Sequence, residues 1–242
     1  MTADGVRVVL GSASPARLRV LRAAGLRPRV LVSDVDEDAL LEELVTAPPH
    51  QVVVRLAQAK ADAVVAALLA EERPDAPTDE TRPDESSAVD TVVLTCDSML
   101  LIDGVLAGKP HTAAVAAERW RSMRGRQGEL LTGHCVAVLS GGEVTASAHA
   151  DAGTMIRFAD IDDATIDSYV ATGEPLSVAG GFTLDGLGGW FIDGIDGDPS
   201  SVLGIGLPTV RALLRRVGID VTRLWSDTAT SNISAGSADA PH

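Results

Sequence analysis

The part of this sequence that decides the fold is Val6-Arg-Val-Val-Leu-Gly-Ser-Ala-Ser-Pro-Ala-Arg17. Residues 6–10 are mostly β-branched and apolar, and they predict a strand that stops at Gly11. Ser14 is a good helix N-cap, and Pro15 suits the first helical position because an N–H would have no partner there. A strand, a turn of small residues and a helix N-terminus present free backbone N–H groups, which favour an anion such as phosphate. An ordinary strand-to-helix turn is the alternative interpretation of the same residues.

Length and composition bound the class of protein. A chain of 242 residues, 45% of them hydrophobic, can build one large α/β domain or two lobes. No stretch reaches the roughly 18 to 20 apolar residues of a membrane span, and the N-terminus has no basic segment followed by an apolar run. The two cysteines, Cys96 and Cys135, have no paired spacing. We therefore expect a protein of a reducing compartment, the cytoplasm.

The charge distribution argues against nucleic acid and singles out two cations. A net charge of −14 leaves little room for a broad basic face, but a small phosphorylated ligand needs only a few local cations. Arg17 offers a planar fork that matches phosphate oxygens. The chain has 18 arginines and only two lysines, Lys60 and Lys109. Since an ammonium is a compact point charge, we expect both lysines at sites that need one, with chance as the alternative.

Lys60 lies on the apolar face of a predicted helix over residues 51–69. The apolar positions recur at three- and four-residue steps, and the face consists of Val53, Leu56, Ala57, Lys60, Ala61, Val64 and Leu68. The lysine either extends to an edge of the protein or points into a cleft that contains anions. We favour the cleft, because a leucine at that position would have been easier to bury.

Lys109 is placed by the turn signal Asp103-Gly104. A tight turn there pairs Ile102 with Val105 and brings Lys109 opposite Ser98, next to Asp97. A carboxylate at a strand end and an ammonium beside it indicate the rim of an active site. A bulge would shift the register by one residue, so the prediction concerns a neighbourhood and not a contact.

The remaining chain divides into short elements, a loop and a tail. Strands are expected at residues 91–96, 98–102, 130–140, 144–148 and 155–158, and helices at 112–123, 162–171 and 207–217, with a glycine-rich stretch over 179–206. The acidic, proline-rich segment 71–90 reads as a disordered surface loop, and 226–242 as a flexible tail. Residues 1–225 are therefore expected to form a single domain with that loop inserted.

Several common sites are absent from the sequence. We find no Walker-type phosphate loop, no His-Glu-x-x-His, no Gly-x-Ser-x-Gly and no Cys-x-x-Cys. The five histidines are scattered, which argues against a histidine metal site or triad. Asp193, Asp196 and Asp198 lack the spacing of a calcium loop and are interpreted as a solvated acidic loop.

Six short motifs in order resemble the Maf family of nucleoside triphosphate pyrophosphatases. Leu10 to Arg17 follows the family's Leu-Ala-Ser-x-Ser-Pro-Arg-Arg except at Gly11 and Ala16. The others are Asp36-Glu37, Leu56 to Ala61, Cys96-Asp97-Ser98 with Gly108-Lys109-Pro110, Tyr169 to Glu174, and Ala179 to Gly186. Both lysines fall on motif positions, and the resemblance covers the chain from Val6 to about Gly218.

The resemblance implies a fold and an activity. The fold would be α/β, with a mixed, bent β-sheet and flanking helices that form two lobes around a nucleotide cleft, as in Maf and ITPase proteins. The reaction would be hydrolysis of a nucleoside triphosphate between the α- and β-phosphates to the monophosphate and pyrophosphate. Such a reaction depends on positioning and charge neutralisation more than on covalent catalysis. A homodimer is common in the family.

The resemblance also assigns roles to residues. Ser12, Ser14, Arg17, Lys60 and Lys109 would hold phosphate oxygens. A divalent cation, Mg²⁺ or Mn²⁺, would bridge them to Glu37 and Asp97. Asp97 would accept the proton of the attacking water. The alternatives are that Asp97 caps a strand end and that Glu37 belongs to a solvated acidic turn.

Three positions differ from the pyrimidine-preferring members of the family. Ala16 replaces their arginine, Ser98 their threonine and Asp185 their glutamine. An ionised aspartate can only accept hydrogen bonds, and guanine offers two adjacent donors. A guanine-type substrate or broad specificity is therefore expected. A non-catalytic, nucleotide-binding regulator of cell division is the alternative function, although such a protein would not need Asp97.

Overall fold

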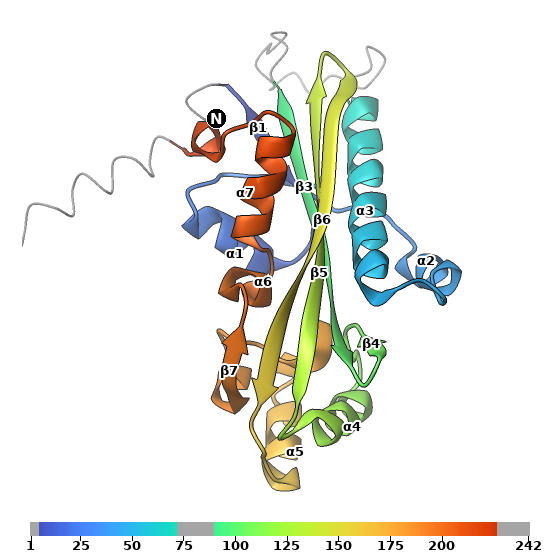
Figure 1. The fold of residues 1–242 in the computed structure, drawn as a ribbon, viewed down its shortest axis with the longest axis vertical. Coiled ribbons are helices and arrows are strands. Elements are labelled where there is room, and N and C mark those ends of the chain that lie inside the picture. The colour runs from blue at the N-terminus through green and yellow to red at the C-terminus, as the bar shows by residue number, and fades with distance from the viewer. Residues whose placement is uncertain (1–4, 72–89, 227–242) are drawn as a thin grey trace, which may run out of the picture.

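The computed structural model describes residues 5–71 and 90–226. Its centre is one mixed seven-stranded sheet with helices on both faces, so the predicted α/β fold with a bent sheet is confirmed (Figure 1). Residues 72–89 of the acidic segment and 227–242 of the tail lie outside the described residues, so these two predictions are not tested.

The sheet has the strand order β2-β1-β3-β5-β6-β7, with β4 paired to β3. The strands are β1 (Arg7–Leu10), β2 (Arg29–Val30), β3 (Thr91–Ile102), β4 (Val105–Ala107), β5 (Gln127–Ser140), β6 (Glu143–Phe158) and β7 (Ile192–Asp196). β1 is parallel to β2 and β3, and every other pairing is antiparallel. β5 and β6 run along almost the whole length of the molecule (Figure 1).

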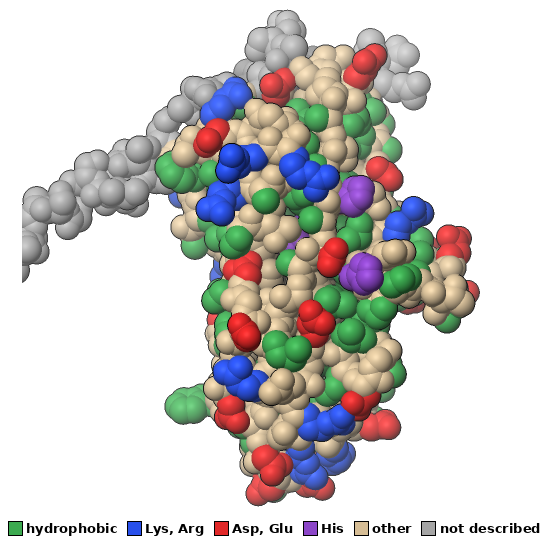
Figure 2. All heavy atoms as spheres, in the orientation of Figure 1, with side chains coloured by type: hydrophobic (Ala, Val, Ile, Leu, Met, Phe, Trp, Pro, Cys, Tyr) green, Lys and Arg blue, Asp and Glu red, His purple; other side chains and the backbone are tan. Residues whose placement is uncertain are grey.

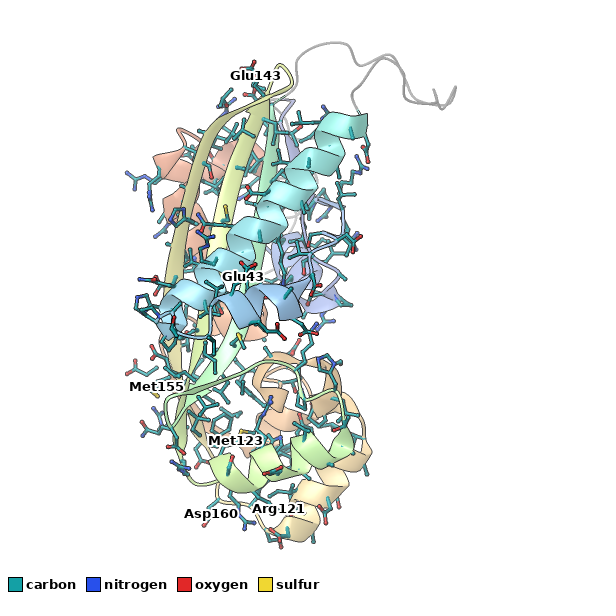
Figure 3. All side chains as sticks on the ribbon, turned by 90° about the vertical axis from the view of Figure 1, so that its right-hand side faces the viewer. Glu43, Arg121, Met123, Glu143, Met155 and Asp160 are labelled. Carbon is teal, nitrogen blue, oxygen red and sulfur yellow. The ribbon has the colours of Figure 1, made fainter. Side chains whose placement is uncertain are left out.

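Helices cover both faces of the sheet and its lower end. They are α1 (Pro15–Ala23), α2 (Glu37–Glu43), α3 (Pro49–Glu71), α4 (Ala113–Met123), α5 (Asp163–Ala171), α6 (Pro199–Leu203) and α7 (Leu207–Arg216), with short 3-10 turns η1 (Glu174–Ser177), η2 (Ala179–Gly181), η3 (Leu187–Phe191) and η4 (Val221–Leu224). In the upper half, α3 covers one face while α1 and α7 cover the other; α4, α5 and η1 to η3 gather in the lower half (Figures 1 and 3).

The long helix α3 approaches the sheet closely because of Gly133 on β5. A Cβ atom at this position would lie 2.1 Å from the backbone oxygen of Val53. Gly133 is also the cross-strand partner of Asp97. The absence of a side chain therefore lets the helix backbone rest on the sheet beside Asp97.

The lower half is built around Trp120, which is fully buried. Its ring packs edge-to-face on Phe158, Tyr169 and Phe191, with centroids 5.8, 5.4 and 5.9 Å away. Its indole N–H donates to the carbonyl of Gly181 at 2.8 Å. Aromatic pairs of this geometry add to the stabilisation that area burial gives.

The sequence predicted several elements correctly. Residues 51–69 lie within α3, and the predicted apolar face is buried, Lys60 included. Ile102 pairs with Val105 across the Asp103-Gly104 turn, as expected. The helices expected at 112–123, 162–171 and 207–217 are α4, α5 and α7.

Two strands that were expected in pieces are continuous. Residues 91–96 and 98–102 are both part of β3, so Asp97 lies inside a strand, and the strand-end interpretation is wrong. Residues 144–148 and 155–158 both belong to β6. The antiparallel pairing of β3 with β4 ends at Leu100 and Ala107, so it does not reach Ser98 and Lys109.

The acidic and glycine-rich parts also differ from expectation. Asp193 and Asp196 lie in β7, and Asp198 caps α6 by accepting the N–H of Ser200 at 2.9 Å, so they do not form a solvated loop. The stretch 179–206 contains η2, η3, β7 and α6. None of the described helices has the length and apolar character needed to cross a membrane.

Charge is unevenly spread on the face drawn in Figure 2, where basic side chains group over α7. Arg211, Arg215 and Arg216 are exposed on this helix. In the lower half, Arg121 and Arg124 are paired with acidic residues of α5. The lower half of the view in Figure 2 shows both acidic and basic side chains.

Candidate active site

Lys60, Asp97 and Glu37 come together from three elements. The Lys60 ammonium on α3 donates to Asp97 Oδ1 on β3 and lies 3.0 Å from Glu37 Oε1 at the start of α2. The side chains of Lys60 and Asp97 are only 9% and 10% exposed, whereas Glu37 is 49% exposed. The ammonium is thus held at the boundary between the core and solvent by two carboxylates. The two carboxylate partners are the anions that the favoured interpretation expects around Lys60.

The register of α3 on β3 explains how Lys60 reaches Asp97. The Thr95 hydroxyl donates to the carbonyl of Ala57 at 2.7 Å, one helical turn before Lys60. Thr95 and Asp97 point to the same face of the sheet because side chains alternate along a strand. A buried charge needs a partner of opposite sign, and Lys60 and Asp97 are each other's partner.

The turn between β1 and α1 has the predicted form. Ser14 is the N-cap of α1, with its hydroxyl 3.5 Å from the N–H of Arg17, and Pro15 opens the helix. Ser12 is buried, and its Oγ accepts from the N–H of Ser14 at 3.2 Å. Three of the five residues expected to contact phosphate, Ser12, Ser14 and Arg17, therefore lie together at a helix N-terminus.

Arg17 is held in place on the opposite side of β3 from Lys60. Its Nε donates to the carbonyl of Gly204 at 3.1 Å, and its Nη1 to Ser12 Oγ at 2.9 Å. These contacts use two of the five N–H donors of the guanidinium and fix its plane. The other three N–H groups of the Arg17 guanidinium therefore have a fixed orientation.

Cys96 connects the two groups. Burial raises the pKa of its thiol, and the charges of Arg17, Asp97 and Lys60 all act on it. Because Leu10 at the end of β1 pairs with Leu94 on β3, the β1–α1 turn follows at the level of the β3 residues that include Cys96 and Asp97.

The other predicted site residues are less tightly held. The Ser98 hydroxyl lies 3.0 Å from Thr132 Oγ1. Lys109 is exposed after β4 and makes no ion pair with the described residues. Ala16 is half-buried on α1, and Asp185 Oδ2 forms an ion pair with Arg19 at 2.9 Å. The structure thus brings Glu37, Lys60 and Asp97 into contact, and also Ser12, Ser14 and Arg17, but Lys109 contacts neither group.

The departure from the family motif at Gly11 has a steric cause. A Cβ atom there would lie 2.6 Å from the Thr95 Cγ2 methyl and 2.9 Å from Val64 Cγ2. An alanine at position 11 would require both side chains to move. The glycine is therefore matched to the threonine on the neighbouring strand.

Glu174 accepts four hydrogen bonds and is not among the predicted site residues. Its Oε1 accepts from Tyr169 Oη at 3.0 Å, Thr183 Oγ1 at 2.5 Å and the Gly188 N–H at 2.9 Å, while its Oε2 accepts from the Leu187 N–H at 2.9 Å. The pKa of Glu174 lies below its usual value: burial acts to raise it, but these donors together outweigh burial. The residue ties the two late motifs together, and its position in the first of them was the only signal in the sequence.

His134, one of the five scattered histidines, has a structural role. It is fully buried on β5, and its Nε2 accepts the N–H of Gly206 at 2.9 Å. Burial and the charge of Arg17 lower its pKa to about 4. The ring is therefore neutral at pH 7 and helps to fix the start of α7.

Glu37 and Asp97 supply carboxylate oxygens, the donor type that Mg²⁺ prefers, and both contact the Lys60 ammonium. Mg²⁺ binds through one or two carboxylates together with substrate phosphates and water. The described residues contain no group of three or more histidine, cysteine or acidic side chains that could hold an ion alone. The pair therefore suits an ion that arrives with phosphate oxygens.

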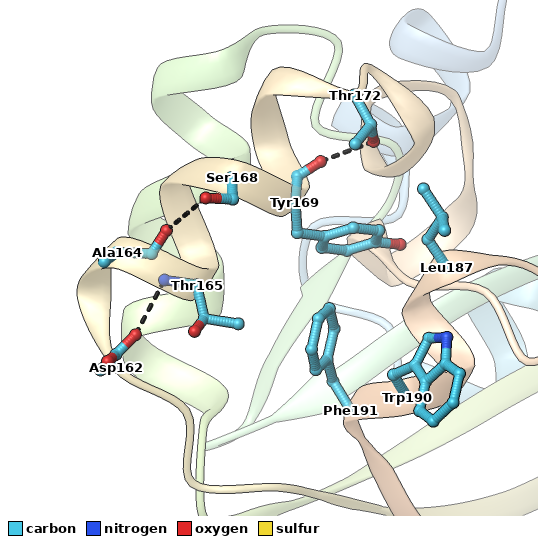
Figure 4. A pocket seen from close by; sticks show the side chains of 9 residues that line it. All are labelled: Asp162, Ala164, Thr165, Ser168, Tyr169, Thr172, Leu187, Trp190 and Phe191. Carbon is cyan, nitrogen blue, oxygen red and sulfur yellow. Dashed lines mark hydrogen bonds between the residues drawn. The ribbon is translucent and has the colours of Figure 1, made fainter.

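A separate pocket of about 400 Å³ lies in the lower half, between α5 and η3 (Figure 4). Tyr169, Leu187, Trp190 and Phe191 line its apolar part. Trp190 is 85% exposed at its edge. None of the predicted site residues lines this pocket, so it is distinct from the candidate site.

The fold is α/β with a mixed sheet, and its first strand leads through a short turn into a helix N-terminus of the kind that binds anions. Together with the buried lysine–carboxylate group, these features are typical of proteins that act on phosphate compounds. Within that class, the chain belongs to the Maf family, because residues 7–217 match the family described as Maf-like protein.

Curated relatives agree with this assignment. A protein named nucleoside triphosphate pyrophosphatase from Saccharopolyspora erythraea is 55% identical over 221 residues, which is 91% of this chain and 97% of the relative. Proteins of the same name from Nocardia farcinica and Rhodococcus opacus are 55% and 54% identical, over 92% and 90% of this chain and 98% and 95% of their own.

Proposed function

We propose that this protein hydrolyses nucleoside triphosphates between the α- and β-phosphates and releases the monophosphate and pyrophosphate. Family membership and the names of the relatives support this activity. The observation that carries it is the buried Lys60 ammonium between Asp97 and Glu37, close to the β1–α1 turn. A role in clearing the nucleotide pool follows from the reaction.

Each predicted residue has a role in the proposed reaction. Ser12, Ser14 and Arg17 bind phosphate oxygens at the helix N-terminus, and Lys60 and Lys109 neutralise the triphosphate. Because transfer of a phosphoryl group depends on positioning and charge, these contacts supply most of what the reaction needs.

Asp97 is the proposed general base. Its Oδ1 accepts from Lys60, which fixes the carboxylate and leaves Oδ2 to accept a proton. The oxygen of water forms the new bond to phosphorus, its proton passes to Asp97, and the anhydride bridge breaks so that pyrophosphate leaves. Glu37 and Asp97 would hold Mg²⁺ or Mn²⁺, which supplies positive charge for the phosphate oxygens.

Base choice is assigned to Ala16, Ser98 and Asp185. The carboxylate at 185 favours a base with N–H donors, of which guanine is one, over the pattern read by a glutamine. Broad specificity is the second outcome, since Ala16 leaves space that water can fill.

The setting of the proposed activity follows from the same residues. Cys96 and Cys135 are free and buried, which favours a reducing compartment, the cytoplasm. We infer a single working domain over residues 1–225, no nucleic-acid or membrane partner, and a homodimer, which stays a prediction.

A panel of nucleoside triphosphates with Mg²⁺ or Mn²⁺, assayed separately for pyrophosphate and for phosphate, tests the proposal. We expect pyrophosphate from the wild type and a loss of at least about a hundredfold in kcat for Asp97→Asn. Asp62→Asn, on the exposed side of α3, is the matched control and should keep full activity. Nucleotide binding without pyrophosphate release would favour the non-catalytic regulator instead.

A further inference from the structure

We propose that Arg19 is a specificity-determining residue that reads the base together with Asp185, and that the pair selects nucleotides whose base carries a carbonyl next to a ring N–H. This inference rests on the proposed function. It changes the role of Asp185 from a lone acceptor, which favours guanine alone, to one half of a donor–acceptor pair, which accepts uracil and thymine as well.

Arg19 stands one helical turn after Ala16 on α1. Residues three apart on a helix lie on the same face, so Arg19 is next to the position at which the family's pyrimidine-preferring members carry an arginine. Its Nη2 donates to Asp185 Oδ2 at 2.9 Å. A guanidinium is therefore present beside residue 185.

The pair joins two distant parts of the chain. Arg19 is on the helix that begins at the phosphate-binding turn, and Asp185 is on the loop 182–186 between η2 and η3. The two side chains are 64% and 43% exposed, so both remain accessible to a ligand. The phosphate-binding turn and the proposed base-reading pair are thus linked by one rigid helix.

The loop itself is held in place by Glu174. Its carboxylate accepts from the Thr183 hydroxyl before Asp185 and from the N–H groups of Leu187 and Gly188 after it. Contacts on both sides of Asp185 fix the backbone of the loop. The carboxylate therefore meets Arg19 at a defined place.

The chemistry of the pair favours one class of base. Oδ2 of Asp185 is engaged by Arg19, which leaves Oδ1 as an acceptor beside the free N–H donors of the guanidinium. Guanine, uracil and thymine place a carbonyl next to a ring N–H, so the carbonyl accepts from Arg19 while the N–H donates to Asp185. Adenine and cytosine carry an amino group and a bare ring nitrogen at the same two atoms. Both contacts then become repulsive.

Two ratios of kcat/KM test the pair, GTP to ATP and UTP to CTP. UTP and CTP differ only in the carbonyl and amino pattern at these two atoms, whereas GTP differs from ATP in this pattern and also in its 2-amino group. We expect the wild type to favour GTP and UTP, and Arg19→Ala to lower each ratio at least tenfold. Asp185→Ala should lower both ratios to the same extent, and the double variant should lower them no further, because the two residues act as a unit.

Arg22→Ala is the matched control, since Arg22 is exposed one turn further along α1 and forms no ion pair with the described residues. It should leave both ratios unchanged. Wild-type ratios in Arg19→Ala, or equal losses in Arg22→Ala, would overturn the proposal.

Binding calorimetry with the α,β-methylene analogues of GTP and ATP separates this proposal from the proposed function. If no nucleotide yields pyrophosphate, the proposed function fails, and the calorimetric ratio still reports the selectivity of the pair. Equal affinities of the wild type for the two analogues would overturn the pair's role. Tighter binding of the GTP analogue that is lost in Arg19→Ala would support it.

Discussion

Lys60→Met should destabilise the protein more than Asp97→Asn does. Lys60 has two carboxylate partners, Asp97 and Glu37, so it keeps Glu37 when Asp97 becomes neutral. The buried Asp97 carboxylate has Lys60 as its ion-pair partner within the described part of the chain, so loss of the ammonium leaves a buried charge alone. Removing Lys60 should therefore lower the free energy of unfolding more than neutralising Asp97 does.

The size of this effect follows from burial. Removing one partner of a buried ion pair lowers the free energy of unfolding by about 3–5 kcal/mol. A carboxylate that loses its partner can also become neutral by taking up a proton, which costs an ordinary aspartate about 4 kcal/mol at pH 7, so the loss should not greatly exceed that value. For a chain of this size, that loss lowers Tm by about 6–20 °C. Asp97→Asn keeps an acceptor for Lys60, and we expect a loss of about 1–2 kcal/mol.

Urea unfolding at pH 7, followed by tryptophan fluorescence, measures both losses. Trp120 is fully buried and reports on the core. Lys109→Met is the matched control, because the other lysine of the chain is exposed and should leave the free energy of unfolding unchanged while lowering activity. An equal or larger loss in Asp97→Asn, or wild-type stability in Lys60→Met, would refute the reasoning.

Three further changes test other parts of the structure by urea unfolding. Burial lowers the pKa of His134 to about 4, so the unfolded chain takes up a proton at higher pH than the folded protein does. Between pH 7 and pH 5, the free energy of unfolding should therefore fall by about 2 kcal/mol more in the wild type than in His134→Asn. His149→Asn is the exposed control and should behave as the wild type. Gly133→Ala should lower the free energy of unfolding by at least about 3 kcal/mol, because the added Cβ would meet the backbone of α3. Gly108→Ala, whose Cβ would have only ordinary contacts, should lower it by less than about 1 kcal/mol. Equal losses in the two variants would contradict the close approach of α3. Glu174→Gln should cost about 1.5–3 kcal/mol, since an amide cannot accept from four converging donors; wild-type stability would argue against that network.

Local patterns predicted the elements that local physics controls. The turn Asp103-Gly104 fixed the register of Ile102 and Val105, because a two-residue turn leaves little choice of pairing. The burial of Lys60 followed from its place in a helical period. Both depend on residues close together in the chain.

Features that depend on distant partners were missed. Asp97 read as a strand end, because a charged residue inside a buried strand is costly unless a partner from elsewhere meets it, and that partner is Lys60 on another element. Likewise, nothing within residues 182–186 indicated that Asp185 meets Arg19, since the two are separated by most of the chain. The contacts of Glu174 with Leu187 and Gly188 are of the same kind.

The long strands β5 and β6 supply backbone to both halves of the molecule, and their pairing is continuous from residue 127 past Gly133 to residue 138. We therefore expect the amide hydrogens of β5 at the level of Asp97 to exchange slowly with solvent, because paired strand continues on both sides of them. Neither half can lose these strands while the other keeps them. Among the parts that carry predicted site residues, α2, the segment around Lys109 and the loop 182–186 lie outside the pairing of β5 with β6.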